Sequence, residues 1–286
     1  MKKISFTVLC IFAVGLMHAQ TQGNKPASTG KIMLSSGQKI IVVTTLSVES
    51  SLSPGMDITN NTVSENILEV KSASDKNYTI SNTLTKLKVN MEMMGQPNSY
   101  DSEKKEDQNS DIGKTFADKL NKPADVIVDN TTGVASSVKK PEQKKDIDAG
   151  DPTQGLLQMF GDNSADAIVS GAFELIPNGK NIGDTWADST IEKDLKVFRN
   201  YTLKEITDTG AVIQLNTTME SVNTMEIQGM QMDMNSNTQS SSEVIVDTAT
   251  SLVKKRTTQA TVTGSFQVMG QSIPITAKAS TISTYK

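Results

Sequence analysis

The residue types that most often carry out chemistry in proteins are almost missing from this chain. Its one histidine, His18, and its one cysteine, Cys10, both lie within residues 1–19, which have the layout of a cleavable export signal. After cleavage no imidazole remains to act as a general base. No thiol remains to bind a metal, attack a substrate or form a disulfide. We therefore expect no catalytic residue, no metal site and no cofactor, and a protein that is not an enzyme.

Sequence motifs for other chemistries also fail when they are checked position by position. Residues 146–151 (DIDAGD) look like the start of a calcium-binding loop, but Asp151 and Leu157 stand where the loop needs Gly and Glu. The chain has no Gly-x-Ser-x-Gly motif and no glycine-rich phosphate loop. Its two arginines, Arg199 and Arg256, and its formal charge of −4 argue against nucleic acid as a partner. An enzyme that uses two carboxylates stays open as a less favoured alternative, because any two acids can meet in a folded chain.

Residues 1–19 carry the three parts of a secretory signal. Lys2 and Lys3 form a basic start, residues 4–17 are apolar, and Ala19 is the small residue at the cleavage position. We expect cleavage after Ala19 and a periplasmic or secreted protein. No later stretch has the ~20 apolar residues that cross a membrane, so no transmembrane segment is expected after cleavage. Residues 20–30 lack hydrophobic periodicity and are expected to form a flexible lead-in.

Patterns typical of β-strands dominate the rest of the chain. Residues 39–48 (KIIVVTTLSV) begin with apolar residues on both faces, which predicts a strand covered on both sides. Further strands are expected over residues 58–70, 78–94, 202–206, 211–222 and 251–268. Several of these exceed the usual length of about 3–10 residues, so they must curve, bulge or break. The predicted fold is mainly β, a curved antiparallel sheet or open barrel with a few short helices; a β-sandwich is the alternative.

The clearest local prediction is a hairpin over residues 223–234 (NTMEIQGMQMDM) with its turn at Gln228-Gly229. In this register Ile227 faces Met230 and Met225 faces Met232, which makes one face of the hairpin apolar. Hairpins of the same kind are expected for residues 91–100 around Gly95 and for residues 266–275 around Gly270. Together with the one tryptophan, the apolar residues of the clearest hairpin form the candidate face for an apolar ligand: Trp186, Met225, Ile227, Met230, Met232 and Met234.

The methionines allow two interpretations. Met91, Met93 and Met94, and the alternating methionines of the hairpin, resemble the thioether sets that bind Cu(I). Alternate residues of a strand face the same side, however, and methionine fills irregular apolar surfaces well. We favour an apolar stripe and keep copper binding as a less favoured alternative.

The order of predicted elements repeats along the chain. One copy runs from Gly37 to the VIVD sequence at residues 126–129, and the other runs from Gly183 to the VIVD sequence at residues 244–247. We expect a single β-rich domain over residues 31–286, with halves at about 31–140 and 183–286 and a mostly helical or loop connector at 141–182. Helices are expected over residues 111–120, with Asp111 as N-cap, and over residues 151–160 and 165–176.

Residues 177–186, which end in Gly183-Asp184-Thr185-Trp186, carry a family resemblance. The segment resembles one found in a family of secreted bacterial proteins of unknown function, in which it stands between two β-rich halves. That resemblance implies the same arrangement here and assigns no activity. At the level of fold, the chain also resembles the half-barrel lipid carriers of the Gram-negative envelope, which is an argument by analogy.

Two functions from different classes follow from these observations. The first is a non-enzymatic binding protein that holds an apolar or lipid-like molecule on a curved sheet. The second is a structural or interaction component of the cell envelope, whose apolar faces contact a protein partner.

Overall fold

The computed structural model describes residues 30–51, 57–93, 95–138, 165–208, 210–227, 230–268 and 271–286. Within these residues the regular structure is almost entirely β. The strands are β1 (Lys39–Ser51), β2 (Asp57–Ala73), β3 (Asn77–Met93), β4 (Gln96–Asp101), β5 (Pro123–Asp129), β6 (Ala135–Ser137), β7 (Thr185–Ile191), β8 (Leu195–Thr207), β9 (Gly210–Ile227), β10 (Met230–Val246), β11 (Val253–Val268) and β12 (Gln271–Tyr285). The helical elements are η1 (Glu106–Asn109), α1 (Asp111–Phe116) and α3 (Ala165–Ser170).

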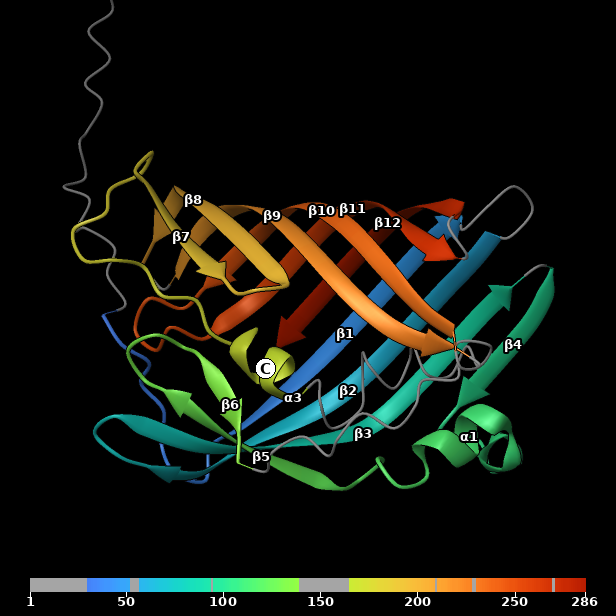
Figure 1. Cartoon of the computed structure of the whole chain (residues 1–286). Coiled ribbons are helices and arrows are strands. Elements are labelled where there is room, and N and C mark those ends of the chain that lie inside the picture. Colours follow the sequence, from blue (N-terminus) through green and yellow to red (C-terminus); the bar gives the residue numbers. More distant parts are fainter. Residues whose placement is uncertain are drawn as a thin grey trace, which may run out of the picture.

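All of these strands belong to one antiparallel sheet with the order β6-β5-β3-β2-β1-β12-β11-β10-β9-β8-β7, and β4 pairs with β3. The first and last strands meet inside the sheet, where Val42 of β1 pairs with Tyr285 of β12. Strands β6 and β7 are its two edges, so the sheet is not closed into a barrel. Figure 1 shows the sheet curving around α3; we call the side that holds α3 the concave face and the opposite side the outer face. The expected curved antiparallel sheet is confirmed, and the β-sandwich alternative is wrong because there is one sheet.

Local irregularities let these long strands curve. Register shifts interrupt the pairing of β2 with β3 at Glu65/Asn66, of β8 with β9 at Leu203/Glu205 and of β10 with β11 at Ile245/Val246. Such bulges bend a strand and increase its twist. At Gly264 in β11, a Cβ atom would overlap the backbone carbonyl oxygen of Asn235 on β10. Glycine therefore permits a close approach of two strand backbones that other residues would block.

The two halves begin with the same backbone contact. Gly37 and Gly183 both have positive φ, at 81° and 92°, a conformation that glycine adopts without a Cβ penalty. The amide of Gly37 donates to the carbonyl of Val70 at 2.8 Å, and the amide of Gly183 donates to the carbonyl of Leu203 at 2.8 Å. Each glycine therefore joins the start of the first strand in its half to the end of the second strand.

The two VIVD sequences lead into the same turn. Asp129 Oδ1 accepts hydrogen bonds from the backbone amides of Thr131 and Thr132, at 2.9 Å each. Asp247 Oδ1 accepts from the amides of Ala249 and Thr250, at 2.9 and 3.0 Å. The fifth residue of each turn, Gly133 or Ser251, has positive φ and donates its amide to the carbonyl of the aspartate at 2.9 Å. These matched contacts support the repeat that the element order predicts.

The halves differ where the chain leaves the sheet between β4 and β5. Strand β10 pairs with β9 along its whole length, whereas the matching partner of β3 is divided into β4 and β5. Elements η1 and α1 lie between them in the sequence. The Ser110 side chain accepts a hydrogen bond from the Gly113 amide at 3.0 Å and is the N-cap of α1, so the expected cap at Asp111 is wrong by one residue. Ile112 and Phe116 of α1 are fully buried.

The main core fills the space between α3 and the concave face. Val169 of α3 packs in one cluster with Ile40 and Leu68 from the first half and with Leu203 and Ile213 from the second. The helix expected over residues 165–176 is shorter than predicted, because α3 ends at Ser170 and the chain continues to a bridge between residues 173 and 252. The helix expected over residues 151–160 lies outside the described residues. Within the described part, no helix has the length and apolar character needed to cross a membrane.

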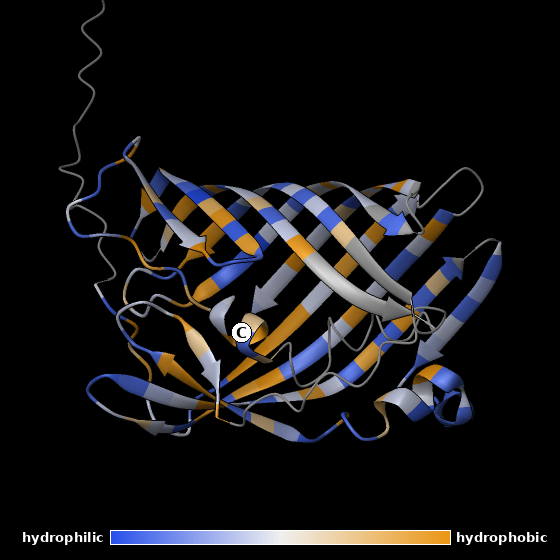
Figure 2. Ribbon diagram, viewed as in Figure 1, coloured by the Kyte–Doolittle hydropathy of each residue, from blue (hydrophilic) through white to orange (hydrophobic). Residues whose placement is uncertain are grey.

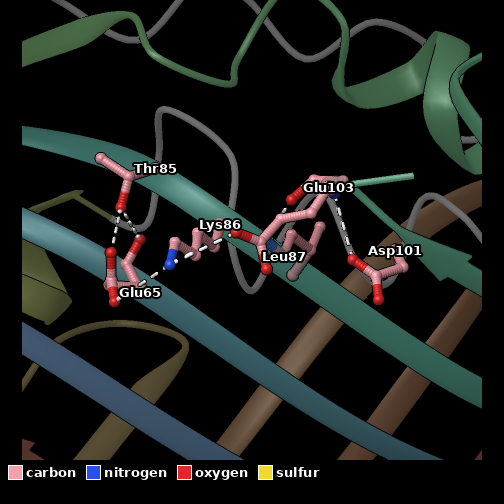
Figure 3. Close-up of polar contacts among 7 residues, drawn as sticks. Glu65, Thr85, Lys86, Leu87, Asp101 and Glu103 are labelled. Carbon is pink, nitrogen blue, oxygen red and sulfur yellow. Dashed lines mark hydrogen bonds and ion pairs between the residues drawn. The ribbon is translucent and has the colours of Figure 1, made fainter. Parts of the chain in front are cut away.

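Hydrophilic and hydrophobic residues alternate along many of the strands (Figure 2), and charged residues such as Glu49, Glu243 and Lys278 occupy outer-face positions. Figure 3 shows one group there, in which Lys86 Nζ lies 3.4 Å from Glu103 Oε1 and 4.0 Å from Glu65 Oε2. Thr85 Oγ1 donates to the carbonyl of Glu65 at 3.0 Å, next to the bulge. On the same face the side chain of Ile41 is 41% exposed. The expectation that residues 39–48 are covered on both sides is therefore wrong for the part of the chain that the structure describes.

Candidate functional site

The predicted ligand residues lie in two separate places on the sheet. The backbone register of the Met-rich hairpin is confirmed, since Ile227 pairs with Met230 and Met225 with Met232; Met234 pairs with residue 223. The side chains of residues 223–233 lie outside what the structure describes. Trp186 lies on β7, where it pairs with Tyr201 of β8, which pairs in turn with Leu215 of β9. Leu215 and Met225 are ten positions apart on β9, or about 33 Å at ~3.3 Å per residue, so Trp186 is not brought to the hairpin.

Between these two places, a row of cross-strand neighbours crosses the concave face, and its side chains are small on every strand except β8. We call it the central row. Its members are cross-strand pairs on β8, β9, β10, β11, β12 and β1: Arg199, Thr217, Ser240, Ala260, Ala279 and Val48. A parallel row lies two residues further along the strands: Val197, Met219, Thr238, Val262, Ala277 and Ser50. All members of the two rows from β9 to β1 are partly exposed.

The concave face is nearly free of charge. From β9 to β3, Arg256 is the one charged residue among the described positions of this face. The neighbouring outer-face positions carry charges such as Glu49, Glu243 and Lys278. Uncharged side chains are needed in the core beside α3, but the central row is only partly buried by the described residues. A half-exposed, uncharged and concave surface is typical of a site for an apolar molecule.

One end of the central row meets a group of aromatic and charged side chains on β7, on β8 and in the segment before β7. We call this group the edge cluster; its members are Lys180, Trp186, Asp188, Arg199 and Tyr201. Trp186 and Tyr201 are stacked, with ring centroids 5.2 Å apart and ring planes within 2° of parallel. Lys180 Nζ lies 5.8 Å from the centroid of the Trp186 ring, close enough for a cation–π contact. Tyr201 donates its hydroxyl hydrogen to Asp188 Oδ2 at 2.8 Å, and Arg199 Nη1 donates to Asp188 Oδ1 at 2.8 Å.

The surroundings of Tyr201 keep its hydroxyl protonated. Burial raises the pKa of Tyr201 well above its usual value, and the nearby carboxylates of Glu174 and Asp188 raise it further. A phenol in this state donates a hydrogen bond at neutral pH and supplies no base. Its role in the edge cluster is to fix the position of Asp188.

A second ion pair joins the segment after α3 to the sheet. Arg256 Nη2 lies 2.9 Å from Glu174 Oε2, and the two side chains are 21% and 12% exposed. Burial raises the pKa of Glu174 above its usual value, although the charge of Arg256 opposes this shift. Arg256 Nε is buried and has no hydrogen-bond partner among the described residues. A buried donor without a partner is costly, so the ion pair with Glu174 satisfies the guanidinium of Arg256 only in part.

The sequence alone does not indicate the contacts of Glu174, Asp188 and Tyr201. One pattern could have pointed to the edge cluster: Arg199 alternates with Val197 and Tyr201, so it falls on the apolar face of its strand. An arginine in that position normally has a partner. The partners come from other elements of the chain, and their approach depends on strand pairing that the sequence alone does not fix.

Neither a group of metal-binding side chains nor a hollow in the surface marks a second site among the described residues. No group of three or more His, Cys, Asp or Glu residues able to hold a metal ion exists among the described residues. A hollow of about 490 Å³ lies over β8 to β11, and its walls include the outer-face residues Glu220 and Asn235. A second hollow of about 480 Å³ lies over β9 to β12, and its walls include the outer-face residues Gln239 and Gln259.

Comparison with known proteins assigns a family. Residues 75–253, more than half of the chain, match a family of unknown function, DUF6263. The chain belongs to this family. The matched residues of the DUF6263 protein extend from β3 to β10 and include the edge cluster. This agrees with the expected membership of a family of unknown function. No curated protein matches the sequence.

Solved structures show only a loose resemblance. OccK5 (OpdH) of Pseudomonas aeruginosa is 6% identical with a TM-score of 0.23, and the match covers 88% of this chain and 98% of that one. Two mutants of the Rh. blastica porin are 5% and 6% identical with TM-scores of 0.22 and 0.24, and each match covers 87% of this chain and 100% of the porin. At these TM-scores the resemblance to porin-like β-barrels carries no argument about function.

Proposed function

We propose that this DUF6263 protein is an exported, non-enzymatic binding protein that holds an elongated, lipid-like molecule against the concave face. The observation that supports this most is the distribution of charge between the two faces of the sheet. From β9 to β1, the central row and its neighbouring row are uncharged and partly exposed. An ordinary solvated sheet face carries charges, as the outer face does here.

The size of the side chains supports the same proposal. Ala260 and Ala279 are adjacent in the middle of the central row, where larger residues would fill the concave side. Apolar contact area removed from water stabilises a complex by about 25 cal/mol per Å². A long apolar chain lying across several strands would therefore gain affinity from many small contacts, without any one strong interaction.

Export is supported by residues 1–19, whose basic start, apolar core and Ala19 have the layout of a cleaved signal. These residues lie outside the described part of the chain. A protein that works outside the cytoplasm, beside membranes, would encounter lipid-like molecules. Mass spectrometry of the exported protein should show a chain that begins at Gln20. A protein that still carries residues 1–19 would overturn this part of the proposal.

Two neighbouring residues on opposite faces allow a matched test. Ala260 lies in the central row and Gln259 on the outer face of the same strand. We expect the wild-type protein to bind the neutral fluorescent probe N-phenylnaphthylamine. Ala260→Glu should weaken binding by roughly tenfold or more, because a carboxylate resists burial against an apolar chain. Gln259→Glu should leave the affinity nearly unchanged. Circular dichroism and urea denaturation check that both variants fold.

Two results would contradict the proposed function. One is a wild-type protein that binds no probe and carries no lipid when it is purified without detergent and examined by native mass spectrometry. The other is an equal loss of binding in the two variants, because the concave face would then have no special role.

A structural or interaction role in the envelope is a second candidate. It is favoured by an apolar group on the outer face, where Ile41, Val63 and Ile282 are each about 40% exposed and lie on the neighbouring strands β1, β2 and β12. Surface groups of this kind often mark protein contacts. Substituting Val63 and Ile282 by serine should abolish capture of a stoichiometric envelope partner, and capture that survives both changes would exclude this contact surface.

A further inference from the structure

Both arginines of the chain are found on the concave face. Arg199 of β8 pairs with Thr217 and begins the central row. Arg256 of β11 pairs with Val244 on one side and Ser283 on the other, next to the main core. Placing a guanidinium on an otherwise uncharged face costs solvation energy. The described lysines of β8 to β12 lie on the outer face or at strand ends.

The guanidinium of Arg199 has donors left over. Its Nη1 donates to Asp188 Oδ1 at 2.8 Å and lies 3.3 Å from Thr190 Oγ1. Its Nε and Nη2 make no hydrogen bond with any of the described residues. The side chain is 33% exposed, so these donors are within reach of a ligand. A guanidinium presents its donors as a planar fork that suits carboxylate and phosphate groups.

A second cation lies beside the aromatic rings of the edge cluster. Lys180 Nζ is 5.8 Å from the centroid of the Trp186 ring and donates to the carbonyl of Thr185 at 2.9 Å. An anion that binds to the free side of Arg199 would also be attracted by Lys180. The exposed pair with Asp188 is worth little by itself, so Arg199 can share its charge with a ligand.

We infer that the ligand is an anionic amphiphile, a fatty acid or a lipid phosphate, whose carboxylate or phosphate binds Arg199 while its apolar chain follows the central row. This inference rests on the proposed function, because it names the head group of the molecule on the concave face. The central row crosses five strand spacings from β8 to β1, about 24 Å at ~4.8 Å per spacing. An extended acyl chain can lie along such a row with its charged end at Arg199 and its apolar end beside Val48.

The test compares three amphiphiles of equal chain length as competitors of bound N-phenylnaphthylamine: dodecanoate, dodecyl phosphate and neutral dodecanol, each below its aggregation concentration. We expect at least one of the two anions to displace the probe at roughly tenfold lower concentration than dodecanol at low salt, and this preference to shrink as salt screens the charges. The stronger of the two anions identifies the head group as carboxylate or phosphate.

Variants of the edge cluster separate the charge from the fold. Arg199→Gln should remove the preference for the anion, so that the anions and dodecanol displace the probe at similar concentrations. Asp188→Asn should strengthen the preference about threefold or more, because it removes a competing carboxylate from Arg199. This opposite effect keeps the inference testable if Arg199→Gln does not fold. Lys196→Gln, on the outer face of the same strand, is the control and should change nothing.

The outcomes distinguish the inference from the function on which it rests. Equal binding of anions and dodecanol, or an anion preference that survives Arg199→Gln, would overturn the inference and leave the proposed function standing. Failure of all three amphiphiles to displace the probe would overturn both.

Discussion

The ion pair between Glu174 and Arg256 connects the segment after α3 to the sheet, and its removal has an effect that can be worked out from the structure. The charged atoms are 2.9 Å apart, and the side chains are 12% and 21% exposed. Breaking a fully buried pair from one side costs about 3–5 kcal/mol, because the other charge is left uncompensated. Since part of the Arg256 side chain reaches solvent, we expect Glu174→Gln to lower the free energy of unfolding by about 2–3 kcal/mol.

The double variant Glu174→Gln/Arg256→Met tests the reasoning more sharply than either single change. It removes both charges and leaves none buried, so its stability should lie within about 1 kcal/mol of the wild type. The four proteins to compare are the wild type, Glu174→Gln, Arg256→Met and the double variant. Their free energies of unfolding are measured by urea denaturation, followed by the fluorescence of Trp186, the one tryptophan of the chain. Glu174 and Arg256 are coupled if the double variant is more stable than the sum of the single effects allows. Simple additivity would refute the account of the pair.

Two further predictions concern pH and backbone packing. Hydrogen bonds from Thr131 and Thr132 lower the pKa of Asp129 to about 2. The ionised side chain therefore stabilises the fold at pH values above its usual pKa, and this stabilisation is lost as pH falls toward 2. Asp129→Asn should therefore weaken this acid-dependent part of unfolding, and an unchanged acid transition would contradict the turn geometry. Gly264→Ala should destabilise the sheet by about 1–3 kcal/mol in thermal or urea unfolding, because the added Cβ would overlap the Asn235 carbonyl. Gly95 has open space around it, so Gly95→Ala is the control that measures only the cost of a positive φ.

Local register could be read from the sequence because turn chemistry and alternation agreed. The cross-strand pairs predicted for the Met-rich hairpin, such as Ile227 with Met230, are confirmed. Hairpins also form where they were expected around Gly95 and Gly270, with Met93 paired to Gln96 and Phe266 paired to Ile273. A shift by one residue would have turned the apolar residues to the wrong face, so few alternatives were available.

Features that depend on distant segments could not be predicted in this way. The apolar residue Ile41 predicted a second cover for β1, but no described residue provides one and the side chain is 41% exposed. The N-cap of α1 is Ser110 and not Asp111, because both residues are good caps and only the folded backbone selects one. Asp188 and Glu174 meet the two arginines through strand pairing and the path of the chain after α3. Neither of these two contacts leaves a spacing pattern in the sequence.

Labelling with a photoactivatable fatty acid, followed by peptide mass spectrometry, tests most directly where a ligand lies on this DUF6263 protein. Along β11 we expect labels on Ala260 and Val262, whose backbone positions belong to the concave face, and none on the alternating residues Gln259 and Thr261. Labels concentrated on the outer-face positions, or spread evenly over consecutive residues, would contradict binding inside the curved sheet.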